Sequence, residues 1–215
     1  MITRGHSLSW LELFEDAVLS QADLLGELDA RNDDGDFAEN VRQGLVFTRE
    51  YLALLPADGA RAPFLALGRG FLEVGSMGGA LLGMVFHAIS RGCRGDDDLT
   101  LSQLAAAVRT ASATVARRTG ATLGQKTLLD ALLPADWALA SAVCAGADGA
   151  TALDQAAAAA ESGARATGAM PNVYGASARR GVPDGGGASD PGAVTVALFF
   201  AAGAHALGRR QGAPV

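Results

Sequence analysis

Three aspartates within a span of eight residues are the group in this sequence best suited to chemistry. Asp29, Asp34 and Asp36 lie in the stretch ELDARNDDGDFAENV, where Gly35 marks a turn between two apolar, helix-like segments. Carboxylates crowded in this way repel one another unless a cation neutralises them. Oxygen ligands suit Mg²⁺ or Ca²⁺, and Mg²⁺ usually arrives with substrate phosphates. The stretch indicates phosphate chemistry, and a solvated loop tip is the competing interpretation.

Familiar ways of binding calcium or ATP do not fit the sequence. If Gly35 stood at position six of an EF-hand loop, positions one and twelve would be Ala30 and Val41, which offer no side-chain oxygen. The sequence also lacks a GxxxxGK[ST] loop and a kinase-type glycine loop followed by a strand lysine. If the protein handles ATP, it must do so with another fold.

Length fits one domain or two small ones, and composition predicts a soluble protein. The chain has 215 residues, enough for a substantial core, and it is 49% hydrophobic. A net charge of −6 argues against a nucleic-acid surface. Lys126 is the only lysine, so the sequence shows no polybasic membrane anchor. The fairly apolar stretch 71–89 contains glycines, Glu73 and His87, and we interpret it as a buried loop and helix rather than a membrane span.

The two cysteines and the N-terminus favour a cytoplasmic location. Cys93 and Cys144 show neither metal-ligand spacing nor a disulfide framework, which is typical of free thiols in a reducing compartment. The start of the chain, MITRGHSLSWLELFED, reaches acidic residues too early for a signal peptide.

The positions of glycine, proline and capping residues predict an all-α fold. Ser9-x-x-Glu12 reads as a capping box that opens a first helix ending near Leu28, and Thr151-x-x-Asp154 resembles a second cap. No segment alternates polar and apolar residues in the way a strand requires. The further helices are expected at residues 37–55, 63–72, 80–90 and 101–118, in a short segment after Gly124, and at 137–147, 151–166 and from Pro191 onward.

Two loops of this arrangement offer anion sites. The glycine-rich turn 75–79 lets a backbone approach a phosphate closely, although such turns are more often plain connections. Asp190 is placed to cap the last helix and Pro191 to open it, and a helix N-terminus favours negative charge. The preceding segment 170–190 is expected to be a flexible lid, and 208–215 to be frayed.

Six motifs, in order along the chain, resemble the nucleotide-binding L-subunit (DhaL) of dihydroxyacetone kinases. They are D-x4-DGD-x3-N (29–40), GSMGGALLG (75–83), GQKTLLDALLPA (124–135), T-x2-M (167–170), GAS (175–177) and DPGA (190–193). The resemblance covers nearly the whole chain. It implies one domain, 1–215, built as a barrel of about eight antiparallel amphipathic helices with the nucleotide held at one end.

The resemblance also implies a site and cofactors. Asp29, Asp34 and Asp36 would bind two Mg²⁺ ions that bridge the phosphates of ATP or ADP, and so neutralise charge on a transferred phosphoryl group. Further nucleotide contacts would come from the residues after the last aspartate, the glycine turn, two residues flanking the base and the start of the last helix: Phe37, Ala38, Glu39, Asn40, Met77, Gly78, Gly124, Leu133, Asp190, Pro191 and Gly192.

The sequence departs from the family pattern at several polar positions. Phe37 and Ala38 stand where the family usually has histidine and glycine, Met77-Gly78 removes a hydroxyl, and Gln125 replaces an aspartate. These changes delete polar contacts to the nucleotide and spare the metal ligands. We therefore expect metal and nucleotide binding to persist with altered chemistry.

One departure removes a cation from the lid. Ala176 stands where the family has an arginine in its GRAS segment, and Arg179 and Arg180 follow closely. Either arginine could reach phosphate oxygens from the lid. A solvated basic pair is the competing interpretation.

Three functions stay open at this stage. The first is a glycerone kinase-type phosphotransferase subunit that uses ATP, or an ADP rephosphorylated in place by a phosphotransferase-system phosphocarrier. The family holds its ketone substrate on a separate K-subunit, so this function would need that partner. The second is a nucleotide-binding regulatory protein with weakened activity, and the third is a kinase subunit for another hydroxy-ketone or sugar. The oligomeric state stays open.

Overall fold

The computed structural model describes residues 1–55, 59–93, 98–173 and 187–208. In these ranges the chain is all-α, as predicted, and a single β-bridge between Ile2 and Leu99 is the only extended pairing. The elements are α1 (Arg4–Ser20), α2 (Ala22–Asn32), α3 (Phe37–Leu54), α4 (Arg61–Glu73), α5 (Met77–Gly92), α6 (Leu101–Thr119), α7 (Leu129–Cys144), α8 (Gly149–Ala166), the 3₁₀ turn η1 (Thr167–Ala169) and α10 (Pro191–Gly208).

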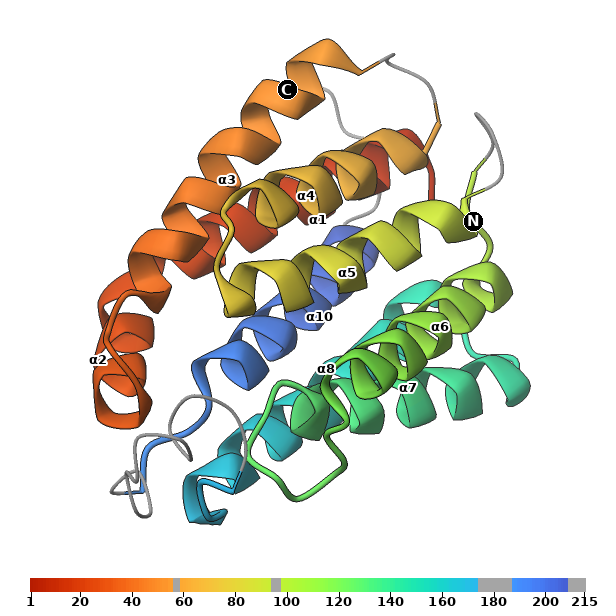
Figure 1. Cartoon of the computed structure of the whole chain (residues 1–215). Coiled ribbons are helices and arrows are strands. Elements are labelled where there is room, and N and C mark those ends of the chain that lie inside the picture. Colours follow the sequence, from red (N-terminus) through yellow and green to blue (C-terminus); the bar gives the residue numbers. More distant parts are fainter. Residues whose placement is uncertain (56–58, 94–97, 174–186, 209–215) are drawn as a thin grey trace.

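The helices form a closed ring. Sequence neighbours pack side by side from α4 through α5, α6 and α7 to α8, and α10 then packs between α8 and α1, which returns to α4 (Figure 1). Short connections between such neighbours make them antiparallel. Helix α3 lies on the outside of α4, and α2 links α1 to α3. The barrel expected from the resemblance is therefore present.

An aromatic core fills the barrel and fixes the position of α10. The indole Nε1 of Trp10 donates a hydrogen bond to the carbonyl oxygen of Phe199 (2.7 Å), and the Trp10 ring also packs against Phe64. A Cβ added at Gly203, one turn after Phe199, would overlap the indole ring. The glycine is needed here because α1 and α10 approach closely. The middle of α10 is thereby held against α1.

Helix α10 is unusually apolar because most of its faces are covered. Within the described part of the chain, it is the one helix long and apolar enough to cross a membrane by length and composition, and 67% of that window is buried inside the protein. The expected loop and helix at 71–89 are a turn at 74–76 followed by α5. Both cysteines are free thiols, with Cys93 buried and Cys144 exposed.

Two of the predicted helix starts are wrong. Helix α1 begins at Arg4, where Thr3 and His6 form the capping box, and Ser9 lies inside the helix. Helix α8 begins at Gly149, and the carboxylate of Asp148 accepts the backbone N–H of Thr151 (3.0 Å). In both cases a better-placed cap upstream satisfies the free amides, so the predicted residues are already helical.

Two predicted segmentations also differ from the structure. The single first helix is two helices, because Gln21 leaves helical geometry between α1 and α2. The two short segments predicted after Gly124 and at 137–147 are one helix, α7, which contains Pro134. Proline usually ends a helix because it cannot donate to the carbonyl four residues earlier, here that of Asp130. Helix α7 is not interrupted, and Gly163 of α8 lies close to the carbonyl oxygen of Asp130.

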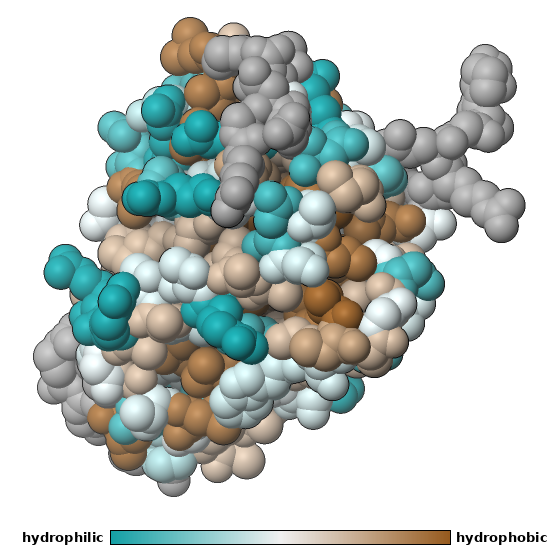
Figure 2. Space-filling model, turned by 90° about the vertical axis from the view of Figure 1, so that its right-hand side faces the viewer, coloured by the Kyte–Doolittle hydropathy of each residue, from teal (hydrophilic) through white to brown (hydrophobic). Residues whose placement is uncertain are grey.

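The alternation of helix directions brings four connections to one end of the barrel. These are the turns or loops between α2 and α3, α4 and α5, α6 and α7, and α8 and α10 (Figure 1). Five of the six motifs lie in the described residues, and each of these five includes part of one of these connections; GAS (175–177) lies outside the described residues. Figure 2 views the molecule from the side that lies to the right in Figure 1, where hydrophobic and hydrophilic residues are intermixed.

Candidate metal centre and its surroundings

The acidic turn gathers the three predicted aspartates. Asp29 is in the last turns of α2 and is 7% exposed, whereas Asp34 and Asp36 are exposed in the turn before α3. One carboxylate oxygen from each lies within 4.8 Å of the other two. Gly35 has a φ of +84°, a conformation that glycine adopts without strain and that folds the turn back. Three hard oxygen donors this close together suit a divalent cation such as Mg²⁺.

Hydrogen bonds orient two of these carboxylates. Oδ2 of Asp29 accepts the backbone N–H of Phe37 (3.1 Å), and Oδ1 of Asp36 accepts the side-chain amide of Asn40 (2.7 Å). Burial raises the pKa of Asp29, the Phe37 N–H opposes that rise, and the neighbouring aspartates, Asp34 among them, add to it. A bound cation would reverse this electrostatic cost, so the donor set fits a metal ion.

The start of α5 forms a second wall of the site. The predicted glycine turn is shorter than expected: Gly75, with a φ of +77°, and Ser76 form it, whereas Met77 and Gly78 are already helical. Ser76 caps the helix, and its Oγ accepts the N–H of Gly79 (3.0 Å). A helix N-terminus such as that of α5 favours a negatively charged group, so the anion site expected here stays a prediction.

The loop between α6 and α7 is shaped by one buried carboxylate. Asp130 is 1% exposed, and its two oxygens accept the N–H groups of Gly124 (2.5 Å) and Thr127 (2.8 Å). Gly124 has a φ of +89°. Lys126, in the same loop, is 7% exposed and has a φ of +57°, which is uncommon outside glycine. Asp130 therefore imposes a strained loop conformation next to the site.

The start of α10 completes this end of the barrel. As predicted, Asp190 caps the helix, with its Oδ2 accepting the N–H of Ala193 (2.7 Å) and Pro191 as the first helical residue. The backbone N–H of Asp190 donates to Oγ1 of Thr167 (2.8 Å). The side-chain amide of Asn32, in α2, donates to the carbonyl of Ser189 (3.0 Å). These bonds connect the acidic turn, the end of α8 and the start of α10.

Asp190 is electrostatically coupled to the rest of the site. Burial raises its pKa to about 7, the Ala193 N–H opposes the rise, Asp130 and Asp29 add to it, and Lys126 lowers it. Charges act on a pKa in this way only at short range. The acidic turn, the α6–α7 loop and the α10 cap therefore share one electrostatic environment.

A pH dependence of stability follows from the raised pKa of Asp190. Between the unfolded value of 3.8 and the folded value of about 7, the folded state binds more protons. The free energy of unfolding therefore falls as pH rises through this window, by up to about 1.4 kcal/mol per pH unit. Chemical denaturation in EDTA at pH 5 and pH 8 measures this loss. Asp190→Asn keeps an acceptor for the Ala193 N–H, and we expect it to reduce the loss; an unchanged difference would contradict the assignment.

Most predicted nucleotide contacts lie at this end of the barrel. Phe37, Ala38, Glu39 and Asn40 form the first turn of α3, and Gly192 packs against Leu128 at the start of α7. Met77 is 70% exposed. Leu133 packs partly buried against the core from α7. Its place beside a base stays a prediction. Ala176, Arg179, Arg180 and most of the lid lie outside the described residues.

Sequence reasoning missed the residues that hold these loops. Asp130, Asn32 and Thr167 all lie within or beside motifs that the resemblance had marked, but no role in holding the loops was assigned to them. Asp130 carried a usable signal, since an aspartate six residues after a glycine turn can accept several backbone amides. The contact from Asn32 to Ser189 carried none, because it joins residues 157 positions apart.

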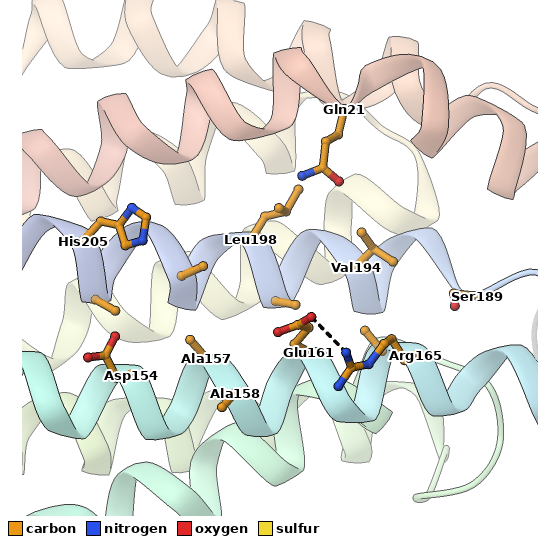
Figure 3. Close-up of a pocket in the computed structure, with 14 residues that line it drawn as sticks. Gln21, Asp154, Ala157, Ala158, Glu161, Arg165, Ser189, Val194, Leu198 and His205 are labelled. Atoms are coloured by element: carbon orange, nitrogen blue, oxygen red, sulfur yellow. Dashed lines mark hydrogen bonds and ion pairs between the residues drawn. The ribbon is translucent and has the colours of Figure 1, made fainter.

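A separate groove lies on the flank of the barrel rather than at the acidic turn. It has a volume of about 470 Å³, and α8 and α10 line most of it, with Gln21 on the far side of α10 (Figure 3). Its floor is largely alanine, Val194 and Leu198, and Glu161 pairs with Arg165 at its rim (3.2 Å). The acidic turn contributes no residue to it.

Comparison with known proteins gives a consistent result. The family model of the DAK2 domain matches residues 33–205. Two solved structures are similar: the dihydroxyacetone kinase from C. freundii in complex with AMP-PNP and Mg²⁺, and its native form. The identities are 25% and 26%, both TM-scores are 0.68, and the matches cover 91% and 93% of this chain. No curated protein sequence matches significantly.

The similar structures are longer than this chain. The matched regions are 33% and 34% of the two C. freundii chains, so this chain spans about a third of their length. The family match, in contrast, takes in most of this chain, from the acidic turn to the last helix. The chain belongs to the DAK2 domain family.

Proposed function

We propose that this chain binds a Mg²⁺–nucleotide complex and serves as the phosphate-donating subunit of a kinase for dihydroxyacetone or a related small ketose. The observation that carries the proposal is the trio of Asp29, Asp34 and Asp36, whose carboxylate oxygens lie within 4.8 Å of one another at the start of the segment that matches the DAK2 domain. A similar structure is that of a dihydroxyacetone kinase with AMP-PNP and Mg²⁺.

Each residue of the site would have a defined task. Asp29, Asp34 and Asp36 would hold Mg²⁺, in our proposal two ions, which would neutralise charge on the phosphates. The Phe37 N–H and the Asn40 amide would keep two of the carboxylates oriented. The N-terminal amides of α5 and α10 would bind phosphate oxygens. Phosphoryl transfer depends mainly on such positioning and charge stabilisation.

The acceptor would be supplied by another polypeptide. The site described above has hard cation ligands and anion-binding helix starts, and we assign no ketone-binding group to it. A K-type subunit would present the ketose, and the donor would be ATP or a retained ADP recharged by a phosphotransferase-system phosphocarrier. A cytoplasmic location is part of the same proposal, since ATP and small ketoses are found in that compartment.

A nucleotide-binding regulatory role is the second candidate. It is favoured by the apolar contact between Phe37 and Gly78, at positions where phosphate-binding sites commonly carry polar groups. Such a protein would bind Mg²⁺–nucleotide and transfer phosphate slowly or not at all.

A phosphorylation assay distinguishes the two candidates. Purified chain is incubated with Mg·ATP and dihydroxyacetone or longer ketoses, with and without a cognate K-type subunit, and phosphorylated ketose is quantified. Product that requires both proteins supports the kinase function. Binding of Mg·ADP by calorimetry without any product supports the regulatory role. If neither binding nor product is detected, and Asp34→Ala behaves like the unaltered chain, both candidates are wrong.

A further inference from the structure

Phe37 joins the acidic turn to the start of α5. Its backbone N–H donates to Oδ2 of Asp29 (3.1 Å), and its ring, in a side chain only 8% exposed, lies against Gly78. A Cβ added at Gly78 would stand 3.0 Å from Cε2 and 3.2 Å from Cδ2 of that ring. One residue therefore contacts both a candidate metal ligand and the candidate phosphate-binding helix start.

A second small-residue contact fixes the same helix end. Ala38 is 9% exposed, and a Cβ added at Gly26 in α2 would lie 3.4 Å from the Cβ of Ala38. The first turn of α3 is thus packed against α2 on one side and against α5 on the other. Both contacts are apolar, so neither needs a ligand to form.

The acidic turn needs such an anchor because its carboxylates repel one another. Oxygens of three carboxylates lie within 4.8 Å of one another. Without a cation, opening the turn would therefore lower their mutual repulsion. Opening would pull Phe37 from Gly78 and expose its ring to water, which opposes the movement. A site held closed in advance binds its ligand more tightly, because less ordering remains to be done on binding.

We infer that Phe37 is a positioning residue: its contact with Gly78 holds Asp29, Asp34 and Asp36 in register for a divalent cation. This inference rests on the proposed Mg²⁺ site and concerns how that site is built. It also explains why Gly78 and Phe37 occur together, since a larger residue at 78 would displace the ring.

The test measures binding of Mg²⁺ alone by isothermal titration calorimetry, together with thermal stability in EDTA. We expect Phe37→Ala to weaken Mg²⁺ binding by about 10-fold or more, the range typical of groups that orient metal ligands. Phe37→Leu keeps apolar volume and should restore most of the affinity. Gly78→Ala should weaken binding in the unaltered background and have no further effect alongside Phe37→Ala, because the ring is then absent.

Two matched controls separate positioning from general stability. Leu45→Ala removes a buried side chain (3% exposed) from the same helix, away from the turn, and should lower the melting temperature without changing Mg²⁺ affinity. Gly208→Ala adds a methyl group where nothing lies within 4 Å, and should change neither the melting temperature nor the Mg²⁺ affinity.

The outcomes keep the two proposals distinguishable. If the unaltered chain binds Mg²⁺ but Phe37→Ala and Gly78→Ala bind it equally well, the inference is overturned and the metal site stands. If Gly78→Ala and Phe37→Ala have additive effects, the contact does not transmit the effect and the inference is again wrong. If the unaltered chain binds no Mg²⁺, both the proposed metal site and the inference about Phe37 are wrong.

Discussion

Asp29→Asn is expected to weaken the binding of Mg²⁺, and of Mg²⁺-dependent nucleotide, by more than about 100-fold. Changes to groups that merely orient metal ligands already cost 10–100-fold, so loss of a charged ligand should cost more. Asparagine keeps an oxygen that can accept the Phe37 N–H, so the local fold should persist. It also removes a buried carboxylate whose pKa is raised by burial, and the apoprotein should not lose stability.

Calorimetry with Mg²⁺ alone and with Mg·ADP measures the loss, and Asp33→Asn is the matched control. Asp33 lies in the same turn and carries the same charge, but it is not among the three clustered residues. Its replacement lowers the local negative charge without removing a ligand, so only a small loss of affinity is expected. Equal losses in the two variants would mean that general charge, not a defined ligand set, attracts the cation.

The fold was predictable because local signals agreed with tertiary packing. Asp190 and Pro191 form a capped helix start that needs no distant partner, and the structure has it as predicted. The acidic turn was predictable for the same reason, since its glycine and carboxylates lie close together in the sequence. The closed barrel came from the family resemblance, because nothing in the periodicity of one helix tells which helices it will touch.

The predictions failed where a distant contact or a competing cap decided the structure. Thr3 and His6 form the capping box, which leaves Ser9 inside the helix, and both candidate caps look alike in sequence. Two short helices were expected, one after Gly124 and one at 137–147, and the structure instead has one helix, α7, that continues through Pro134. The loop-shaping role of Asp130 was missed although its signal, an aspartate shortly after a glycine turn, is local in the sequence.

The departures from the family pattern gain a physical reason from the structure. Considered separately, Phe37 and Gly78 are two positions at which a polar group of the family pattern is lost. In the structure they are the two halves of one contact, in which the ring occupies the space that a side chain at position 78 would need. Packing stands at this wall where the family has polar groups, and in the proposed function phosphate binding would then rely on metal ions and backbone amides.

Gly163→Ala is expected to lower the free energy of unfolding by about 3 kcal/mol or more. The added Cβ would overlap the carbonyl oxygen of Asp130 and would stand 3.1 Å from the Cα of Ala131. These are backbone atoms, which cannot rotate aside as a side chain can, so α8 must move away from α7. Overpacking of side chains typically costs 1–3 kcal/mol, and a backbone clash belongs at or beyond the upper end of that range.

The close approach has a chemical reason as well as a steric one. Pro134 cannot donate to the carbonyl of Asp130, which would otherwise be bonded within the helix. Gly163 brings its Cα–H against that oxygen, a weak interaction that partly compensates the carbonyl and that no other residue type allows at this distance. The two helices therefore meet where one has a proline and the other a glycine.

Denaturant titration and thermal melting measure the effect of Gly163→Ala. For a chain of this size each kcal/mol corresponds to about 2–4 °C, so a fall of roughly 6–12 °C is expected. Gly208→Ala, with open space around the new methyl group, should leave the melting temperature unchanged. If the free energy of unfolding of Gly163→Ala lies within about 0.5 kcal/mol of that of the unaltered chain, α7 and α8 do not approach so closely.

The same substitution should separate metal binding from nucleotide binding. Moving Asp130 disturbs the amides of Gly124 and Thr127 that its carboxylate holds, whereas the acidic turn belongs to other helices. At a temperature where Gly163→Ala is folded, we therefore expect Mg²⁺ affinity close to that of the unaltered chain and weaker binding of Mg·ADP. Parallel losses of both would mean that the α6–α7 loop and the acidic turn move as one unit.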